Sequence, residues 1–372
     1  MSSVRLDLVS DFIAPGLACV NPVFAAPAAP DPRAVPLIAL AVPGQEKAPA
    51  KKKAQISLSD CLACSGCVTS AETVLLQMQS AQQFVSDCRV VASSGGAQRV
   101  VVVTLSPQSR ASLAARLGIS AAEAHQRVAH ALKTRLGVSH VLNASTLAHE
   151  VSQTQVAHEF VAKFRANQPL PLISSSCPGW VCYAEKSQPA VLPYLCTAKS
   201  AQQVAGVIVK QALARRLGLR ASEIYHAAVM PCPDKKLESA RGEFASDGAR
   251  DVDLVLTSTE LCDALLSTFD DNDGITLHDA VATGDADPSS GVEPKGEEYF
   301  TAEEPSAGGS GSYAAYCFRY AAHELFGVVV PPAPLPFRAG RNADSWSIEL
   351  EVQGKTVLRF EVGVRFAQRA DS

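Results

Sequence analysis

Hydrophobic and polar positions change their period several times along the chain, and these changes predict helices that alternate with strands. Residues 100–104 form a largely apolar run of the kind that builds buried strands. Residues 138–142, 172–174, 224–230 and 254–258 are also strand-like. Helical periodicity fills residues 120–136 and 199–217. This alternation favours a mainly parallel sheet with helices packed outside it.

Other patterns flank this central region. Residues 70–84 predict one helix, with Ser70 as its cap and Glu72 in the first turn, where a negative charge suits the helix dipole. Residues 314–326 predict a further helix, and residues 348–362 alternate as a pair of hairpin strands do.

Composition divides the chain further. Residues 21–53 hold a Pro- and Ala-rich stretch that suits an extended linker. Residues 268–307 carry 11 acidic residues against the single Lys295, which indicates a solvated insertion. We therefore expect an N-terminal segment (1–20), a linker (21–53), a cysteine loop with its helix (54–98), an α/β region (99–267), the acidic insertion (268–307) and the remainder of the α/β region (308–372).

Composition and charge exclude several classes of protein. The 372 residues are 47% hydrophobic and 19% charged, as in ordinary globular proteins, and the net charge of -4 offers no basic field for nucleic acid. We expect neither a signal peptide nor a membrane span. The 11 cysteines are then expected to be reduced thiols of a cytosolic or nuclear protein, where cysteines are more often ligands than bridges.

The most specific motif is the run Cys61, Cys64 and Cys67, in which the thiols recur every third residue. Three thiolates on one short loop can bind three corners of a [4Fe–4S] cluster. A bacterial ferredoxin run would continue with a cysteine where this chain has Ala71, so the fourth ligand must come from elsewhere. Cys19 and Cys88 are the nearest candidates along the chain.

Other interpretations of these motifs are weaker. A structural zinc site pairs two Cys-x2-Cys units, or one such unit with two histidines, and the chain has no second unit. Disulfides between cysteines two residues apart are rare. The stretch from Asp271 to Gly274 is similar to a calcium loop, but Phe269 and Ala280 then occupy positions that need carboxylates.

A second constellation joins two similar segments. Cys177 and Cys232 each follow a strand-like run and small turn residues, and each precedes Pro and a helical segment. Ligands of open α/β sheets bind at the carboxyl ends of strands, so the two thiols are expected to share a site. At a helix start, backbone N–H groups and the dipole are expected to lower the pKa of a thiol.

Several motifs together resemble a known family. They are CLACSGC with VTSAET, SSCPGW with VCYAEK, TAKSAQQ, MPCPDKKLESAR, DLVLTSTEL and GGSGSY with FRYAAHELFG. In this order they resemble the iron-only hydrogenase-like proteins of cytosolic iron–sulfur assembly, a family that includes the prelamin-A recognition-factor-like group. The resemblance implies the fold of the iron-only hydrogenase large subunit, with two α/β lobes, mainly parallel sheets and an N-terminal cluster-binding segment.

The resemblance also implies a ligand set. It assigns Cys19, Cys61, Cys64 and Cys67 to an N-terminal [4Fe–4S] cluster, and Cys177 and Cys232 to a second, buried cluster. The second cluster takes two further cysteines from a C-terminal C-x3-C motif, which does not follow Cys317 here. We expect the sequence to be truncated within that motif, or the second cluster to be lost or completed by a ligand such as Cys317. Five cysteines match no ligand position of the family: Cys88, Cys182, Cys196, Cys262 and Cys317.

The implied function is assembly rather than hydrogen chemistry. Ser176 stands where the hydrogenases have a proton-relaying cysteine, and a hydroxyl relays protons poorly at neutral pH. Lys235 matches a hydrogenase lysine that faces the di-iron unit, but it is equally a helix-start side chain near a polar loop. The resemblance implies a cytoplasmic and nuclear assembly factor whose partners are a scaffold, a WD40 protein and a helical-repeat adaptor. A non-catalytic nuclear lamin-associated protein is the alternative.

Overall fold

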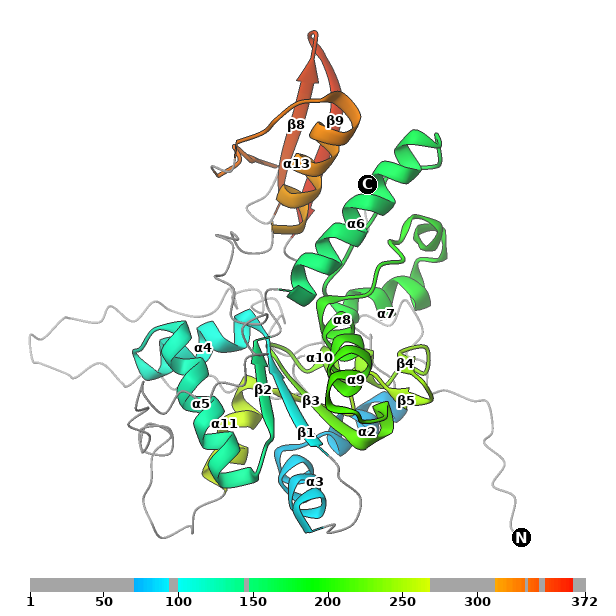
Figure 1. Ribbon diagram of the computed structural model, residues 1–372. Coiled ribbons are helices and arrows are strands. Elements are labelled where there is room, and N and C mark those ends of the chain that lie inside the picture. Colours follow the sequence, from blue (N-terminus) through cyan, green and yellow to red (C-terminus); the bar gives the residue numbers. More distant parts are fainter. Residues whose placement is uncertain are drawn as a thin grey trace, which may run out of the picture. The chain divides into compact units, whose positions relative to one another are not determined.

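The computed structural model describes residues 70–93, 100–143, 147–267, 312–331, 334–340 and 345–363 (Figure 1). Contacts divide the chain into two units, Met1–Ser70 and Ala71–Ser372. Apart from Ser70, every described residue belongs to the second unit. The fold of that unit is therefore what positions the candidate site.

The described helices and strands follow the alternation that the sequence predicts. The α-helices are α2 (Ser70–Met78), α3 (Ala81–Ser93), α4 (Pro107–Leu117), α5 (Ala121–Leu136), α6 (Leu147–Arg165), α7 (Pro178–Ser187), α8 (Ala201–Val207), α9 (Ala214–Leu217), α10 (Asp234–Ser239), α11 (Ser258–Leu266) and α13 (Ser312–Phe326). The π-helix η3 (Ile208–Leu213) joins α8 to α9, and η2 (Pro189–Tyr194) and η4 (Ala221–Glu223) are 3-10 helices. The strands are β1 (Val100–Leu105), β2 (His140–Asn143), β3 (Ile224–Met230), β4 (Ala245–Ser246), β5 (Ala249–Arg250), β6 (Leu254–Thr257), β7 (Arg338–Ala339), β8 (Ser345–Val352) and β9 (Lys355–Gly363).

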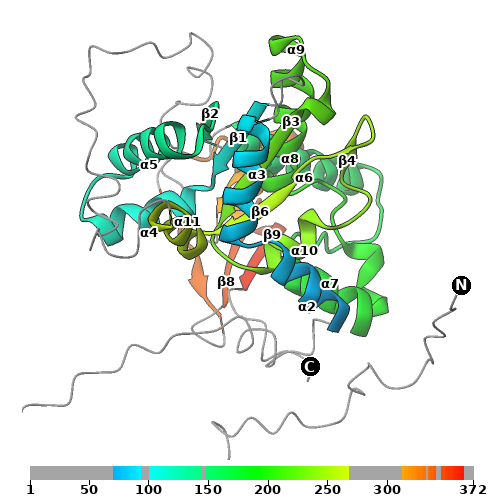
Figure 2. The ribbon, with the colours of Figure 1, turned by 90° about the horizontal axis from the view of Figure 1, so that it is seen from below.

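A four-stranded parallel sheet in the order β2-β1-β3-β6 forms the centre of the fold. Val101, Val103 and Leu105 of β1 pack with α3, α4, α5 and α11 on one face. On the other face, Val102 packs with η3 and α9. In Figures 1 and 2, α4, α5 and α11 accordingly lie on one side of the sheet and α8 and α9 on the other. Because both faces are covered, these strands are continuous apolar runs rather than alternating ones.

A second apolar cluster joins α6, α13 and the β8–β9 hairpin, with Val161, Ala321, Ala322 and Leu358 at its centre. The sheet here has the order β7-β8-β9 and is antiparallel. The α/β class and its mainly parallel sheet are thus confirmed. Among the described strands, the parallel pairs all belong to the central sheet, so no second parallel sheet accompanies it there.

Two predicted elements differ from the structure. The helix expected over residues 70–84 is two helices, because the Ser80 side chain accepts the Gln83 N–H at 3.2 Å and α3 starts afresh. The strand expected at residues 172–174 is a single bridge between Ile173 and Leu195. Backbone hydrogen bonds there run only to residues 194–196, so this segment lies outside the central sheet.

The interior of the central sheet contains a fully buried histidine. His226 Nδ1 lies 2.8 Å from the carbonyl oxygen of Asp251, and its Nε2 lies 3.0 Å from Thr104 Oγ1. A carbonyl can only accept, so Nδ1 carries the proton and Nε2 accepts from the threonine hydroxyl. Burial lowers the pKa of His226 to about 4, and the ring is neutral in the folded protein.

This histidine predicts a loss of stability in acid. The folded-state pKa lies below the unfolded value, so the unfolded chain takes up a proton that the folded chain does not. We expect the free energy of unfolding to fall by about 3 kcal/mol between pH 6.5 and pH 4. Urea unfolding across this range measures it. His226→Gln keeps a polar side chain that does not titrate and should show a shallower fall; equal slopes would contradict the assignment.

Candidate metal centre

The predicted ligands of the N-terminal cluster, Cys19, Cys61, Cys64 and Cys67, lie outside the described residues. Their assignment stays a prediction from the sequence. Cys177 and Cys232 are described, and the fold shows what surrounds them.

Cys232 lies two residues beyond the carboxyl end of β3. β1 is followed in sequence by its neighbour β2, whereas β3 pairs with the opposite edge of β1. From β1 the chain therefore continues to β2 on one side and later adds β3 on the other side. In open α/β sheets, ligands bind at such a switch point, here between β1 and β3. The carbonyl of Val229 accepts from the Ser106 backbone N–H at 3.0 Å and from Ser109 Oγ at 3.2 Å. These bonds tie the carboxyl ends of β1 and β3 together beside Cys232.

Cys177 is the exposed N-cap residue of α7, and Pro178 occupies the first helical position. Its backbone N–H donates to Ser175 Oγ at 3.2 Å, which closes a turn ahead of the helix. The prediction that Cys177 follows a strand of the sheet is wrong, because residue 173 forms only the isolated bridge to Leu195. Only Cys232 follows a strand of the central sheet.

The structure brings the two cysteine segments together through α7 and α10, which lie side by side in Figures 1 and 2. Gly179 of α7 faces Asp234 of α10 so closely that a Cβ on the glycine would lie 3.0 Å from Asp234 Oδ2. The two cysteine segments therefore lie in one neighbourhood, whereas the expectation that the two thiols share a site stays a prediction.

The expectation of a lowered pKa is wrong for Cys232. Burial, followed by the nearby charge of Asp234, raises the pKa of this thiol to about 11. Cys232 precedes Pro233, the N-cap of the six-residue α10, and the Lys235 backbone N–H of the first turn bonds to it, but desolvation outweighs this bond. Cys232 is a protonated thiol at neutral pH, and a cation must displace its proton to bind there.

Lys235 is neither solvent-exposed nor turned toward an open loop. Its Nζ lies 2.7 Å from Glu238 Oε2, and both side chains are at least 90% buried. Ser200 donates to the other oxygen of Glu238, and Gln202 Nε2 donates to the Lys235 carbonyl at 3.1 Å. Two residues of the TAKSAQQ motif, at the N-terminus of α8, thus hold α10 in place through hydrogen bonds.

A second buried lysine fixes α10 from the other side. Lys236 Nζ donates to Glu260 Oε1 and to the carbonyl of Gln79, both at 2.6 Å, and its side chain is 1% exposed. The Gln79 side chain returns a bond to the Lys236 carbonyl and accepts from Val255 N. Because Glu260 also caps α11, this ammonium group joins α10 to α11 and to the residue after α2.

Of the remaining described cysteines, Cys182 is buried in α7 and the other four lie elsewhere. Cys88 and Cys262 belong to the apolar core of the central sheet. Cys317 packs with Val156 and Ala157 of α6, beside Cys196. The Cys196 thiol donates to Glu159 Oε2 at 3.1 Å, and burial raises its pKa to about 12. Nothing in this packing places Cys317 beside Cys177 and Cys232.

The donors present fit part of an iron–sulfur ligand set. Two thiols at adjacent helix starts are the soft ligands that iron in such clusters takes. Gln202, whose Nε2 donates to the Lys235 carbonyl, has its Oε1 buried without a hydrogen bond, and Asp234 is half buried. No three His, Cys, Asp or Glu side chains in the described ranges are grouped to hold a single metal ion. The described residues therefore offer Cys177 and Cys232, and further ligands would come from beyond these ranges.

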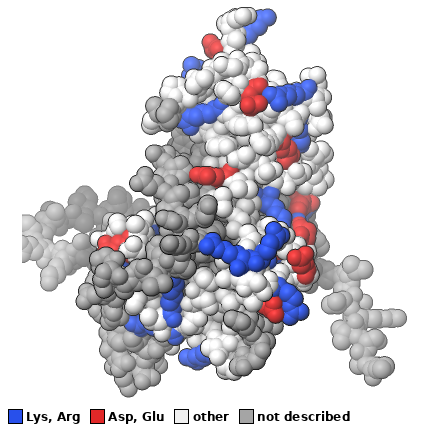
Figure 3. Space-filling view, in the orientation of Figure 1, with Lys and Arg blue, Asp and Glu red and all other residues white. Residues whose placement is uncertain are grey.

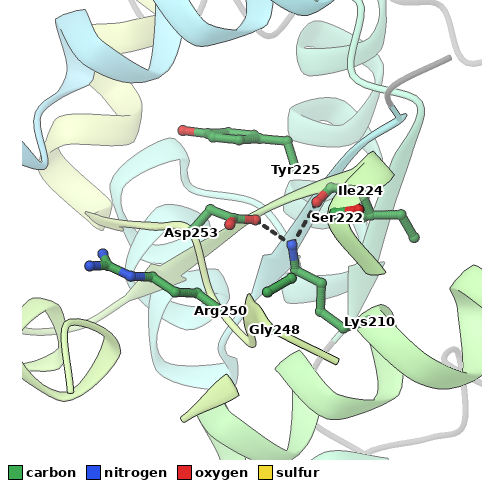
Figure 4. A pocket seen from close by; sticks show the side chains of 8 residues that line it. Lys210, Ser222, Ile224, Tyr225, Gly248, Arg250 and Asp253 are labelled. Atoms are coloured by element: carbon green, nitrogen blue, oxygen red, sulfur yellow. Dashed lines mark hydrogen bonds and ion pairs between the residues drawn. The ribbon is translucent and has the colours of Figure 1, made fainter. Parts of the chain in front are cut away.

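A separate cavity of about 250 Å³ lies at the opposite, amino end of β3 (Figure 4). Lys210 Nζ points into it but already donates to Asp253 Oδ2 at 2.7 Å and to the Ile224 carbonyl at 2.6 Å. Its charge is matched by the carboxylate, and we assign this cavity no chemistry.

On the face shown in Figure 3, basic and acidic side chains are interspersed among uncharged ones. Across the described ranges, no helix combines the length and apolar character of a bilayer-crossing segment.

The buried ammonium group of Lys236 predicts a stability test. Lys236→Met leaves the Glu260 carboxylate and the Gln79 carbonyl without their donor, so we expect the free energy of unfolding to fall by about 3 kcal/mol. The matched change Lys355→Met, at the exposed hairpin, should alter it by less than about 0.5 kcal/mol. Urea unfolding of the two variants tests this, and equal stabilities would exclude a structural role for the Lys236 charge.

Comparison with known proteins supports this picture. The profile of the C-terminal domain of the iron-only hydrogenase large subunit matches residues 99–365. Protein NAR1 of Arabidopsis thaliana is 40% identical over 377 residues, covering 96% of this chain and 74% of its own length. Cytosolic iron-sulfur assembly component 3 of Rattus norvegicus is 39% identical over 381 residues, covering 98% of this chain and 76% of its own.

Solved structures show the same fold. An apo [FeFe]-hydrogenase from Chlamydomonas reinhardtii superimposes with a TM-score of 0.56 at 23% sequence identity, covering 72% of this chain and 64% of its own. At this identity the likeness concerns the fold and not the chemistry.

Proposed function

The chain belongs to the iron-only hydrogenase-like family of cytosolic iron–sulfur assembly proteins, and we propose that it helps deliver [4Fe–4S] clusters to cytosolic and nuclear apoproteins. The observation that carries this proposal is that α7, which Cys177 caps, starts beside α10, which follows Cys232. The run Cys61, Cys64 and Cys67 supports it from the sequence. A scaffold upstream and a WD40 protein with a helical-repeat adaptor downstream are the proposed partners.

The residues around the second site favour assembly over hydrogen chemistry. Ser176, which precedes Cys177, is exposed and offers a hydroxyl that keeps its proton at neutral pH. Lys235 is neutralised by Glu238 rather than left as an isolated cation. We therefore propose that the protein is not a hydrogenase and that its clusters are held for transfer or as electron relays.

The two cysteine groups have different proposed roles. Cys19, Cys61, Cys64 and Cys67 would hold a peripheral cluster, with one ligand separated from the others by the Pro- and Ala-rich linker. A long linker makes that ligand the easiest to detach, which suits exchange. Cys177 and Cys232 would hold a deeper cluster, since Cys232 follows a buried strand.

Iron and acid-labile sulfide content, with reduced-state EPR on anaerobically purified protein, tests this proposal. We expect Cys61→Ala to lose the N-terminal cluster, about four irons per chain, and Cys177→Ala to lose only what the second site holds. Cys262→Ala, a buried thiol in the core of the central sheet, is the control and should keep all its iron.

The total iron separates the two sites. About four irons in the wild type would mean a single N-terminal cluster, and about eight, with half retained in Cys61→Ala, would mean that the second site is also filled. Zinc in place of iron, or iron unaffected by both substitutions, would reject the proposal.

A further inference from the structure

The helix that carries Cys177 buries only small side chains completely. These are Pro178, Gly179, Cys182 and Ala184, whereas the larger Trp180, Val181 and Tyr183 are half buried. Small side chains remove little apolar area from water, and hydrophobic stabilisation is roughly proportional to that area. Polar contacts can therefore add to this packing in setting the position of α7, which decides where the Cys177 thiol lies.

Two polar contacts join α7 to the α10 segment. At the first turn, the carboxylate of Asp234 lies against Gly179. At the last turn, Glu185 receives both branches of the Arg241 guanidinium: Nη2 lies 2.5 Å from Oε1, and Nη1 lies 3.1 Å from Oε2. Such a bidentate pair fixes orientation as well as distance. The pairing with Glu185 raises the pKa of Arg241, so its charge is permanent.

The α10 side of these contacts is firmly held. Lys236 binds Glu260 and Gln79, and Lys235 binds Glu238, all through buried or half-buried groups. Arg241 follows two residues after the end of α10. The polar contacts of α7 thus end on a segment that is strongly anchored.

We propose that Arg241 is a positioning residue which, by holding Glu185, fixes α7 against α10 and keeps the Cys177 thiol beside Cys232 before an iron–sulfur centre binds. The proposal rests on the proposed function, because that function assigns both thiols to one centre. It adds a residue outside the ligand motifs and predicts that the thiol pair is already formed in the apoprotein.

The chain supplies a matched control for the Arg241–Glu185 contact, which we call the clamp. Arg241 Nε also donates to Glu243 Oε1 at 2.7 Å, two residues further along the same segment. Glu185→Gln and Glu243→Gln each remove one carboxylate from the same guanidinium. Only the first releases α7, because Glu243 belongs to the Arg241 side of the contact.

Dibromobimane measures the proximity of the two thiols, since it becomes fluorescent only when both of its ends have alkylated. The experiment uses the full-length apoprotein with Cys61, Cys64 and Cys67 changed to Ser, and peptide mass spectrometry identifies the product that joins Cys177 to Cys232. We expect Glu185→Gln to lower its rate of formation about tenfold, and Glu243→Gln to leave it within about twofold of the parent.

Arg241→Lys separates charge from geometry. Lysine keeps the positive charge but cannot make the two parallel hydrogen bonds of a guanidinium. We therefore expect a cross-linking rate between those of the parent and Glu185→Gln. Circular dichroism identifies any variant that fails to fold. If Glu185→Gln does not fold, a rate for Arg241→Lys below that of the parent supports the proposal, and an unchanged rate overturns it.

Equal rates for Glu185→Gln and Glu243→Gln would overturn the clamp, and so would a parent that yields no Cys177–Cys232 product. Iron content decides the proposed function separately. A wild-type chain that binds no iron would reject that function, while the cross-linking rates would still show whether Arg241 positions the thiols.

Discussion

The buried ammonium group of Lys236 is the interaction on which the candidate site depends. It binds Glu260 and the Gln79 carbonyl at 2.6 Å, in a place where water does not reach. A buried charge that lost these partners would be costly, so the three segments that supply and receive it must stay together. Since α10 starts two residues after Cys232, the same interaction decides where that thiol lies.

A series of polar contacts connects the rest of the candidate site to the segment that Lys236 holds. Lys235 and Glu238 connect α10 with the start of α8 through Ser200 and Gln202. Arg241 connects it with the end of α7. The apolar core of the central sheet supplies stability, but polar groups set the relative positions of the helices that carry cysteines.

The chain shares its fold with hydrogenases, but its proposed role is different. The central parallel sheet belongs to the part of the chain that shares its fold with the hydrogenases, and in this chain Cys232 lies beyond the end of β3. Chemistry depends on the groups around that thiol. Here a serine precedes Cys177 and the nearby Lys235 is paired with Glu238, and these two features underlie the proposal of assembly rather than hydrogen chemistry. A fold of this kind can hold a cluster without turning over hydrogen.

The sequence by itself determined the strands of the central sheet, most helices and the cysteine motifs, because apolar runs and thiol spacing are local properties. It predicted β1, β3 and β6 closely, since each is buried on both faces and so reads as a continuous apolar run. It did not separate α2 from α3, and it took residues 172–174 for a strand, because three apolar or small residues do not reveal whether a sheet edge is within reach.

Only the tertiary structure decided the electrostatics of the site. The raised pKa of Cys232 depends on burial and on Asp234, and local helix position had suggested the reverse. Arg241 and Glu185 are 56 residues apart, and nothing in their local pattern marks them as partners. Long-range contacts of this kind depend on how α7 and α10 pack, and desolvation depends on everything that covers them. Spacing along the chain therefore predicted the ligands, whereas packing determined the protonation of Cys232 and the positions of Cys177 and Cys232.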